Sequence, residues 1–176
     1  MSTRGHVAVK EDGKYRYIYN HYDSYIDGLG ITLYKYYNDV KKVRNLIELG
    51  DTSSIGCTLE NSANSYKEHL SRPVGERGTV AFFRESKRWK DYQDNEEIWE
   101  ECQARETEDI NEVLRAEYAY IFDVDENKWY MAYWNDKGRL RDLEKVLHSK
   151  KILEELFSNV YIEKYLPTFY NKCLSA

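Results

Sequence analysis

The sequence is poor in the residues that cross-link a chain or break its secondary structure. Its 176 residues include only three cysteines and two prolines. Cys57, Cys102 and Cys173 lie far apart and form no Cys-x-x-Cys motif, so neither a zinc knuckle nor a redox pair is expected. We expect the three cysteines to be buried free thiols.

Long apolar runs are also missing. No run approaches the roughly 18 residues that cross a bilayer, and residues 1–6 contain no apolar stretch of signal-peptide length. Hydrophobic residues still make up 41% of the chain, which is enough for a core. We therefore expect a cytoplasmic protein with one domain over residues 1–176, in which 1–56 hold a hairpin and a helix pair and 57–176 hold the remainder.

The net charge of −5 excludes a generally basic, nucleic-acid-coating protein. The charge is unevenly distributed, because residues 1–50 carry eight Lys/Arg against six Asp/Glu, a balance of +2. Residues 94–126 carry thirteen Asp/Glu against two Arg, a balance of −11. We expect this acidic segment to matter for partner binding.

Polarity patterns predict the elements. Residues 7–10 and 15–19 alternate in polarity around Asp12-Gly13, which is a strong hairpin signal. Helical spacing follows over 31–37 and 40–47, with Asn38 or Asp39 as a cap and Gly50 as a stop. The remaining segments are predicted in this order: a loop at 51–56, a short helix at 60–71, a strand at 79–84, acidic helices at 95–104 and 108–117, a hairpin of 118–124 with 128–134, and helices from 140 to about 165. The fold class predicted is α+β, with a mostly antiparallel sheet built from two hairpins plus a central strand and packed by several helices.

The tyrosine-rich stretch 15–37 contains the best candidate site, because it holds eight of the seventeen tyrosines beside ionisable residues. The hairpin register predicts that residues 5 or 6 lie opposite 19 or 20. That pairing would bring Arg4 and His6 within reach of His21, Asp23 and Tyr25. An imidazole near a carboxylate has its tautomer fixed and its basicity raised, and an arginine can hold a phosphate.

These five residues could support metal-independent phosphodiester cleavage, with His21 as base or acid and Arg4 stabilising charge. The alternative is an ordinary hydrogen-bond network. His21 and Asp23 alone make only two metal ligands, so no metal and no cofactor are expected. Gly28-x-Gly30 before a helix lacks the third glycine of a phosphate loop, and we interpret both glycines as turning the chain into the helix.

Two further segments are candidate binding surfaces. The first is a basic and aromatic patch that fits phosphate contact with base stacking, or else a solvated loop after a strand; its residues are Arg84, Lys87, Arg88, Trp89 and Lys90. The second is the acidic segment, which is either a solvated pair of helices or a mimic of the phosphate backbone that occupies a basic channel. Glu97, Glu101 and Asp109 would contact the partner in that case.

Several short motifs stand in the first third of the chain: Thr3-Arg4-Gly5-His6-Val7, Ile18-Tyr19-Asn20-His21-Tyr22-Asp23-Ser24-Tyr25, Gly28-Leu29-Gly30-Ile31-Thr32-Leu33, Lys42-Val43 and Leu46-Ile47-Glu48-Leu49-Gly50-Asp51-Thr52-Ser53-Ser54. Together they resemble a group of small phage and prophage proteins. Tyr22 stands where the group has Trp, and Ser24 stands where it has Gly. Beyond residue 56 the likeness fades.

The resemblance implies an origin in a mobile genetic element rather than a mechanism. Compact accessory proteins of such elements often counter host immunity, as anti-CRISPR proteins do. The hypothesis is therefore an anti-defence protein in the host cytoplasm that disables a nucleic-acid-guided nuclease, by blocking its channel or by trimming its guide RNA. Two alternatives stay open: a stand-alone nuclease or nucleotide hydrolase, and a non-catalytic accessory binding protein. The sequence leaves the oligomeric state open.

Overall fold

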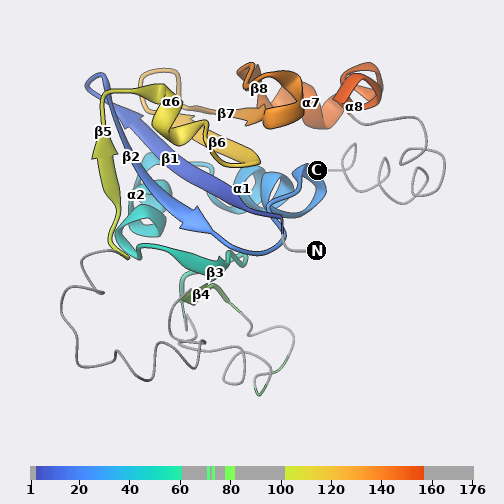
Figure 1. The fold of residues 1–176 in the computed structure, drawn as a ribbon. Coiled ribbons are helices and arrows are strands. Elements are labelled where there is room, and N and C mark those ends of the chain that lie inside the picture. Colours follow the sequence, from blue (N-terminus) through green and yellow to red (C-terminus); the bar gives the residue numbers. More distant parts are fainter. Residues whose placement is uncertain (1–2, 61–70, 72, 74–77, 82–101, 157–176) are drawn as a thin grey trace.

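A mixed β-sheet with helices on both faces organises the molecule (Figure 1). The computed structural model describes residues 3–60, 71, 73, 78–81 and 102–156. Within these residues the strand order is β4-β3-β2-β1-β6-β7-β8, and β5 pairs with the outer part of β2. Neighbouring strands are antiparallel except for the parallel pairs β1–β6 and β2–β3. The predicted α+β class with a mostly antiparallel sheet is thus confirmed.

The elements of the described residues have the following bounds. The strands are β1 (Gly5–Glu11), β2 (Lys14–Asn20), β3 (Thr52–Ser54), β4 (Val80–Ala81), β5 (Arg105–Thr107), β6 (Tyr118–Asp123), β7 (Lys128–Tyr133) and β8 (Arg141–Asp142). The helices are α1 (Ile31–Tyr36), α2 (Val40–Glu48), α6 (Ile110–Val113), α7 (Leu143–His148) and α8 (Lys150–Leu156), with a π-helical turn η1 (Ile26–Gly30) and a 3₁₀ turn η3 (Trp134–Asp136).

The first hairpin forms where the sequence predicts it. Asp12 (φ 51°) and Gly13 (φ 74°) are both left-handed, as a two-residue type I′ turn requires. The turn sets a register in which Gly5 lies opposite Asn20 and His6 lies opposite Tyr19. The start of β1 and the end of β2 are therefore neighbours, as predicted.

Strand alternation divides the core between the two faces of the sheet. Val7, Val9 and Ile18 join the larger cluster, which includes buried residues of α1, α2 and α7. The intervening positions Ala8 and Tyr17 face the opposite side, where Val113 of α6 covers them. Figure 1 shows α1 and α2 on one side of the sheet and α6 on the other. The side chains of His6 and Tyr19 share the α6 face, since successive residues of a strand alternate.

The helix pair after the hairpin is also confirmed. Asp39 caps α2 by accepting a hydrogen bond from the Lys42 N–H at 2.9 Å. Gly50 ends the helix with φ 82°. A side chain there would put its Cβ 2.4 Å from the carbonyl oxygen of Cys102. Both the positive φ and this close contact therefore require glycine.

Three local predictions are wrong. Residues 51–56 were expected to be a loop but contain β3, which forms because Thr52 pairs with Asn20 and with Ala81. The predicted acidic helix 95–104 does not continue through 102–104, which are a turn and a bend before β5. The predicted helix 108–117 is a single turn, α6, because the chain pairs as β5 with β2 before it and as β6 with β1 after it.

The second hairpin is confirmed as β6 and β7, and the helical pattern from 140 onward appears as α7 and α8, interrupted at Ser149. The strand predicted at 79–84 is described only as β4, at the edge of the sheet. Most of the predicted helix 60–71, the patch 84–90, and the chain beyond Leu156 lie outside the described residues.

Cys102 is buried as expected, but Cys57 is exposed, and Cys173 lies outside the described residues. Among the described helices, none has the length and apolar content to cross a bilayer.

Candidate functional site

Four polar side chains meet on the α6 face, where β1 begins and β2 ends. His6 lies opposite Tyr19 in the register, and alternation puts their side chains on one face. Arg4 and His21 lie just outside the two strands, and the charge of Arg4 acts on both Tyr19 and His21. Ring contacts link three of them, because the Tyr19 ring centroid lies 6.3 Å from that of His6 and 5.9 Å from that of His21. We call Arg4, His6, Tyr19 and His21 the histidine cluster.

The His6 imidazole is held in one orientation by the backbone of α6. Its Nδ1 lies 2.9 Å from the carbonyl oxygen of Val113. A carbonyl can only accept, so Nδ1 carries the proton and the neutral ring keeps its lone pair on Nε2. Burial lowers the pKa of His6, the bond to Val113 partly offsets this, and the Arg105 guanidinium lowers it further. The ring is therefore a neutral base at physiological pH.

His21 and Tyr19 form a hydrogen-bonded pair. The Tyr19 hydroxyl lies 2.8 Å from Nδ1 of His21. Burial lowers the pKa of His21, and the positive charge of Arg4 lowers it further. Burial raises the pKa of the Tyr19 phenol, which therefore keeps its proton. An imidazole and a protonated phenol are thus placed within reach of an exposed guanidinium.

An ion pair between the buried Asp51 carboxylate and the partly exposed Arg105 guanidinium supports the Tyr19 backbone. The Asp51 carboxylate, which is 3% exposed, accepts two hydrogen bonds from the Arg105 guanidinium, each of 2.9 Å. The same carboxylate accepts from the backbone N–H of Tyr19 at 2.8 Å. Asp51 thereby ties together β2, β5 and the residue before β3. This geometry fixes the backbone from which Tyr19 projects.

Two of the five predicted catalytic residues lie elsewhere. The Tyr25 ring packs against Tyr118, with the ring centroids 6.4 Å apart. Asp23 lines a pocket formed by the loop that follows β2, η1, α1 and the chain around β3, and its backbone is left-handed, with φ 56°. The prediction that Arg4 and His6 approach His21 is consistent with the structure, whereas the carboxylate proposed to accompany them is not in the cluster.

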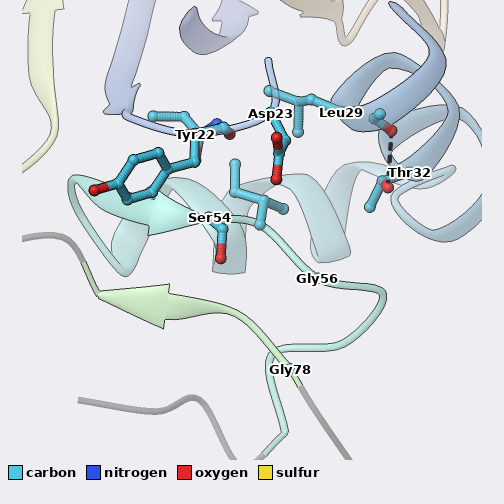
Figure 2. A pocket seen from close by; sticks show the side chains of 10 residues that line it. Tyr22, Asp23, Leu29, Thr32, Ser54, Gly56 and Gly78 are labelled. Atoms are coloured by element: carbon cyan, nitrogen blue, oxygen red, sulfur yellow. Dashed lines mark hydrogen bonds between the residues drawn. The ribbon is translucent and has the colours of Figure 1, made fainter. Parts of the chain in front are cut away.

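The pocket has a volume of about 320 Å³ (Figure 2). Its walls come from the loop after β2, from η1 and α1, and from the chain around β3 and before β4. The lining residues are Asn20, Tyr22, Asp23, Gly28, Leu29, Thr32, Ser54, Ile55, Gly56 and Gly78. Figure 2 shows Tyr22 and Asp23 projecting from the loop towards the segment of Ser54 and Gly56. The ring of Tyr22 also contacts that of His21, with 4.4 Å between centroids, so the pocket adjoins the histidine cluster.

Gly28 shapes this pocket by close approach rather than by an unusual φ. A Cβ on Gly28 would lie 2.7 Å from the Asp23 carbonyl oxygen, which accepts from the Leu29 N–H at 3.0 Å. Gly30 packs on the Tyr120 ring, where a Cβ would be 3.3 Å away. Gly28 therefore closes the loop and η1 around Asp23, while Gly30 lets η1 lie against the sheet.

The predicted binding surfaces are only partly within the described residues. Arg84, Lys87, Arg88, Trp89, Lys90, Glu97 and Glu101 lie outside them. Asp109 is described, and its carboxylate caps α6 by accepting from the Asn111 backbone and side-chain N–H groups, both at 2.9 Å. The carboxylate of Asp109 therefore stabilises the start of α6. In the described part of the chain, no group of three or more His, Cys, Asp and Glu side chains is arranged to hold a metal ion.

Sequence reasoning missed Tyr19, the Asp51–Arg105 pair and most of the pocket. Tyr19 could have been found, because the spacing Tyr17-x-Tyr19-x-His21 puts these residues on one strand face. Asp51 and Arg105 are 54 residues apart, and no local pattern links them. Comparison with known proteins finds no family model, no curated protein and no solved structure that matches this chain.

Proposed function

We propose that the chain cleaves RNA at the histidine cluster, and that it thereby disables a host nucleic-acid-guided nuclease by trimming its guide RNA. The observation that supports cleavage is the cluster itself, in which two imidazoles flank a phenol beside an exposed guanidinium. These are the groups that phosphodiester transfer needs: a base, a proton donor and a cation for the phosphate oxygens.

The reaction would proceed by attack of a ribose 2′-oxygen on the adjacent phosphorus. Nε2 of His6 takes the 2′-hydroxyl proton while the new P–O bond forms. The bond from phosphorus to the 5′-oxygen of the next nucleotide breaks, and the Tyr19–His21 pair returns a proton to that oxygen. Arg4 holds the phosphate oxygens as charge develops on them. The products are a 2′,3′-cyclic phosphate and a 5′-hydroxyl.

The biological setting is inferred from the phage-like motifs of the first third of the chain. Trimming is favoured over channel blocking because the histidine cluster offers reactive groups. Of the three acidic residues assigned to blocking, only Asp109 is described, and its carboxylate is engaged in capping α6. The proposed partner is therefore a CRISPR-type effector loaded with its guide RNA.

Three matched substitutions test the cleavage. His6, His21 and His148 each use Nδ1 for a hydrogen bond, with Val113, Tyr19 and Glu144 respectively. An asparagine amide can reproduce a contact at Nδ1 but offers no Nε2. RNA cleavage by the purified chain in EDTA should fall about 10²–10⁴-fold in His6→Asn and His21→Asn. It should be unchanged in His148→Asn, an exposed control on α7.

A gel of guide RNA after mixing with a loaded effector separates the rival functions. Shortened guide with wild type, and intact guide with His21→Asn, would support the proposal. Cleavage of free RNA but not of bound guide would indicate a stand-alone nuclease instead. Intact RNA in every lane would contradict cleavage and leave a non-catalytic binding protein.

A further inference from the structure

The pocket beside His21 presents one carboxylate from a fixed position. Asp23 is exposed and takes a left-handed backbone, φ 56°, a conformation that aspartate adopts more readily than most residues. Its carbonyl oxygen is held by the Leu29 N–H, and Gly28 leaves the space that this contact needs. Among the described residues, no hydrogen bond or ion pair engages the Asp23 carboxylate. The Asp23 carboxylate on the wall of this pocket is therefore available to a ligand.

Several other polar groups around the pocket are already engaged. The Asn20 amide N donates to the Tyr22 carbonyl oxygen at 2.6 Å and to the Ser24 hydroxyl at 2.9 Å. The Asn20 carbonyl oxygen accepts from Thr52 at 2.9 Å. The Thr32 hydroxyl donates to the Gly28 carbonyl oxygen at 3.0 Å (Figure 2). The Asp23 carboxylate therefore remains as a charged acceptor in the pocket, near the Ser54 hydroxyl, and it suits a ligand edge that carries donors.

We propose that this pocket binds a guanine base, with the two Asp23 oxygens accepting from the guanine N1–H and 2-amino group. Guanine presents these two donors side by side, so they match a carboxylate in a bidentate contact. Uracil presents oxygens on both sides of its single N–H, and these would face the Asp23 oxygens. A volume of about 320 Å³ suffices for a base with part of its ribose.

Because the pocket adjoins the histidine cluster, a base bound in it would influence which RNA linkage is cleaved. Tyr22 links the two sites, because the residue lines the pocket and its ring contacts the His21 ring, with 4.4 Å between centroids. A guanine held there would bring a neighbouring phosphate to the histidine cluster. On this basis, which rests on the proposed function, the RNA cut most readily is one with guanosine beside the scissile phosphate.

Titration of the full chain with GMP, IMP and UMP by calorimetry tests the pocket directly, because the phosphate is the same in all three. GMP should bind at least about tenfold more tightly than UMP, with IMP between them because it lacks the 2-amino donor. Asp23→Asn should weaken GMP binding about tenfold or more. Asp12→Asn is the matched control, since Asp12 is exposed and also left-handed, with φ 51°.

Equal affinity for the three nucleotides, or unchanged GMP binding in Asp23→Asn, would overturn the inference. Tighter binding of AMP, CMP or UMP than of GMP would overturn the assignment of the base. These measurements contain no cleavable bond, so they are independent of catalysis. If GMP binds as expected but RNA stays intact, only the proposed function fails; if RNA is cut but GMP does not bind, only the pocket inference fails.

Discussion

At the residue scale, the candidate site depends on the different partners of two histidines. His6 is oriented by a backbone carbonyl, whereas His21 is joined to a phenol and faces a guanidinium. Burial favours the neutral form of both rings, since charging a buried imidazole costs solvation free energy. The two histidines are therefore suited to accept and relay protons. Binding of the phosphate by charge is assigned to Arg4.

Arg4→Gln should raise the pKa of His21 towards the ordinary value of about 6.5. The reason is that Arg4 contributes to the lowering while burial, the larger cause, stays. The pKa of His21 should thus move only part of the way. A titration of the imidazole resonances by NMR measures this shift.

Arg44→Gln is the control for that titration, because Arg44 pairs with Glu11 near the hairpin turn, at the far end of β1. It should leave the His21 titration where it is in the wild type. An unchanged pKa in Arg4→Gln would show that the guanidinium does not reach His21.

The sequence predicted part of this site for a physical reason. A type I′ turn has a fixed register, so the proximity of Arg4, His6 and His21 follows from Asp12-Gly13 alone. The side chain of Asp23 could not be placed in the same way. The Asp23 backbone has a left-handed φ, and its carbonyl oxygen accepts a hydrogen bond from the Leu29 N–H. No pattern in the sequence predicts that conformation.

At the element scale, glycine positions and one ion pair determine how the short segments join the sheet. β3 and β5 pair with different parts of the same edge of β2, through only one and three residue pairs respectively. Such short strands carry weak sequence signals, which explains why 51–56 was predicted as a loop and why β5 was not predicted. The two hairpins have long alternating runs, and both were predicted correctly.

Gly50→Ala should destabilise the fold much more than Gly13→Ala. Both glycines have positive φ, 82° and 74°, so alanine costs about 1–2 kcal/mol of backbone strain at either site. At Gly50 the added Cβ would also lie 2.4 Å from the Cys102 carbonyl oxygen, whereas nothing lies within 4 Å at Gly13. The displaced backbone should add about 1–3 kcal/mol at Gly50. Urea unfolding of the two variants measures the difference, and equal losses would contradict the close contact.

Arg105→Ala should lower the free energy of unfolding by roughly 1–3 kcal/mol, because it leaves the buried Asp51 carboxylate without its charged partner. Lys14→Ala is the control, since Lys14 of β2 pairs with Glu106 of β5 but both side chains are at least half exposed. The control should hardly change stability. Comparable losses in the two variants, measured by urea unfolding, would contradict a structural role for the Asp51–Arg105 pair.

At the scale of the whole molecule, the sheet separates packing from chemistry. One face carries the larger core with α1, α2 and α7, and the other carries a small core with the histidine cluster at its margin. The strand order could not be predicted from the sequence, because the parallel pair β1–β6 joins strands separated by more than a hundred residues. Fold class followed from the hairpins and helices, but this pairing needed tertiary structure.

The position of the cluster also explains why charge alone indicated little about function. Net charge is negative, and the segment with a balance of −11 includes α6 and β6, which contact His6 and the Arg4 backbone. Local groups at the β1–β2 margin, and not a basic surface, are proposed to meet the RNA. Modest affinity for long RNA with reaction at defined positions is the expected behaviour.

The central claim is that the histidine cluster activates a ribose 2′-hydroxyl. The most direct measurement uses an RNA with a single 2′-deoxy nucleotide at a position that the wild-type chain cuts in the all-ribose strand. This linkage should stay intact while the others yield 2′,3′-cyclic phosphate and 5′-hydroxyl ends. Cleavage of the deoxy linkage at an equal rate, or products with 5′-phosphate ends, would contradict it.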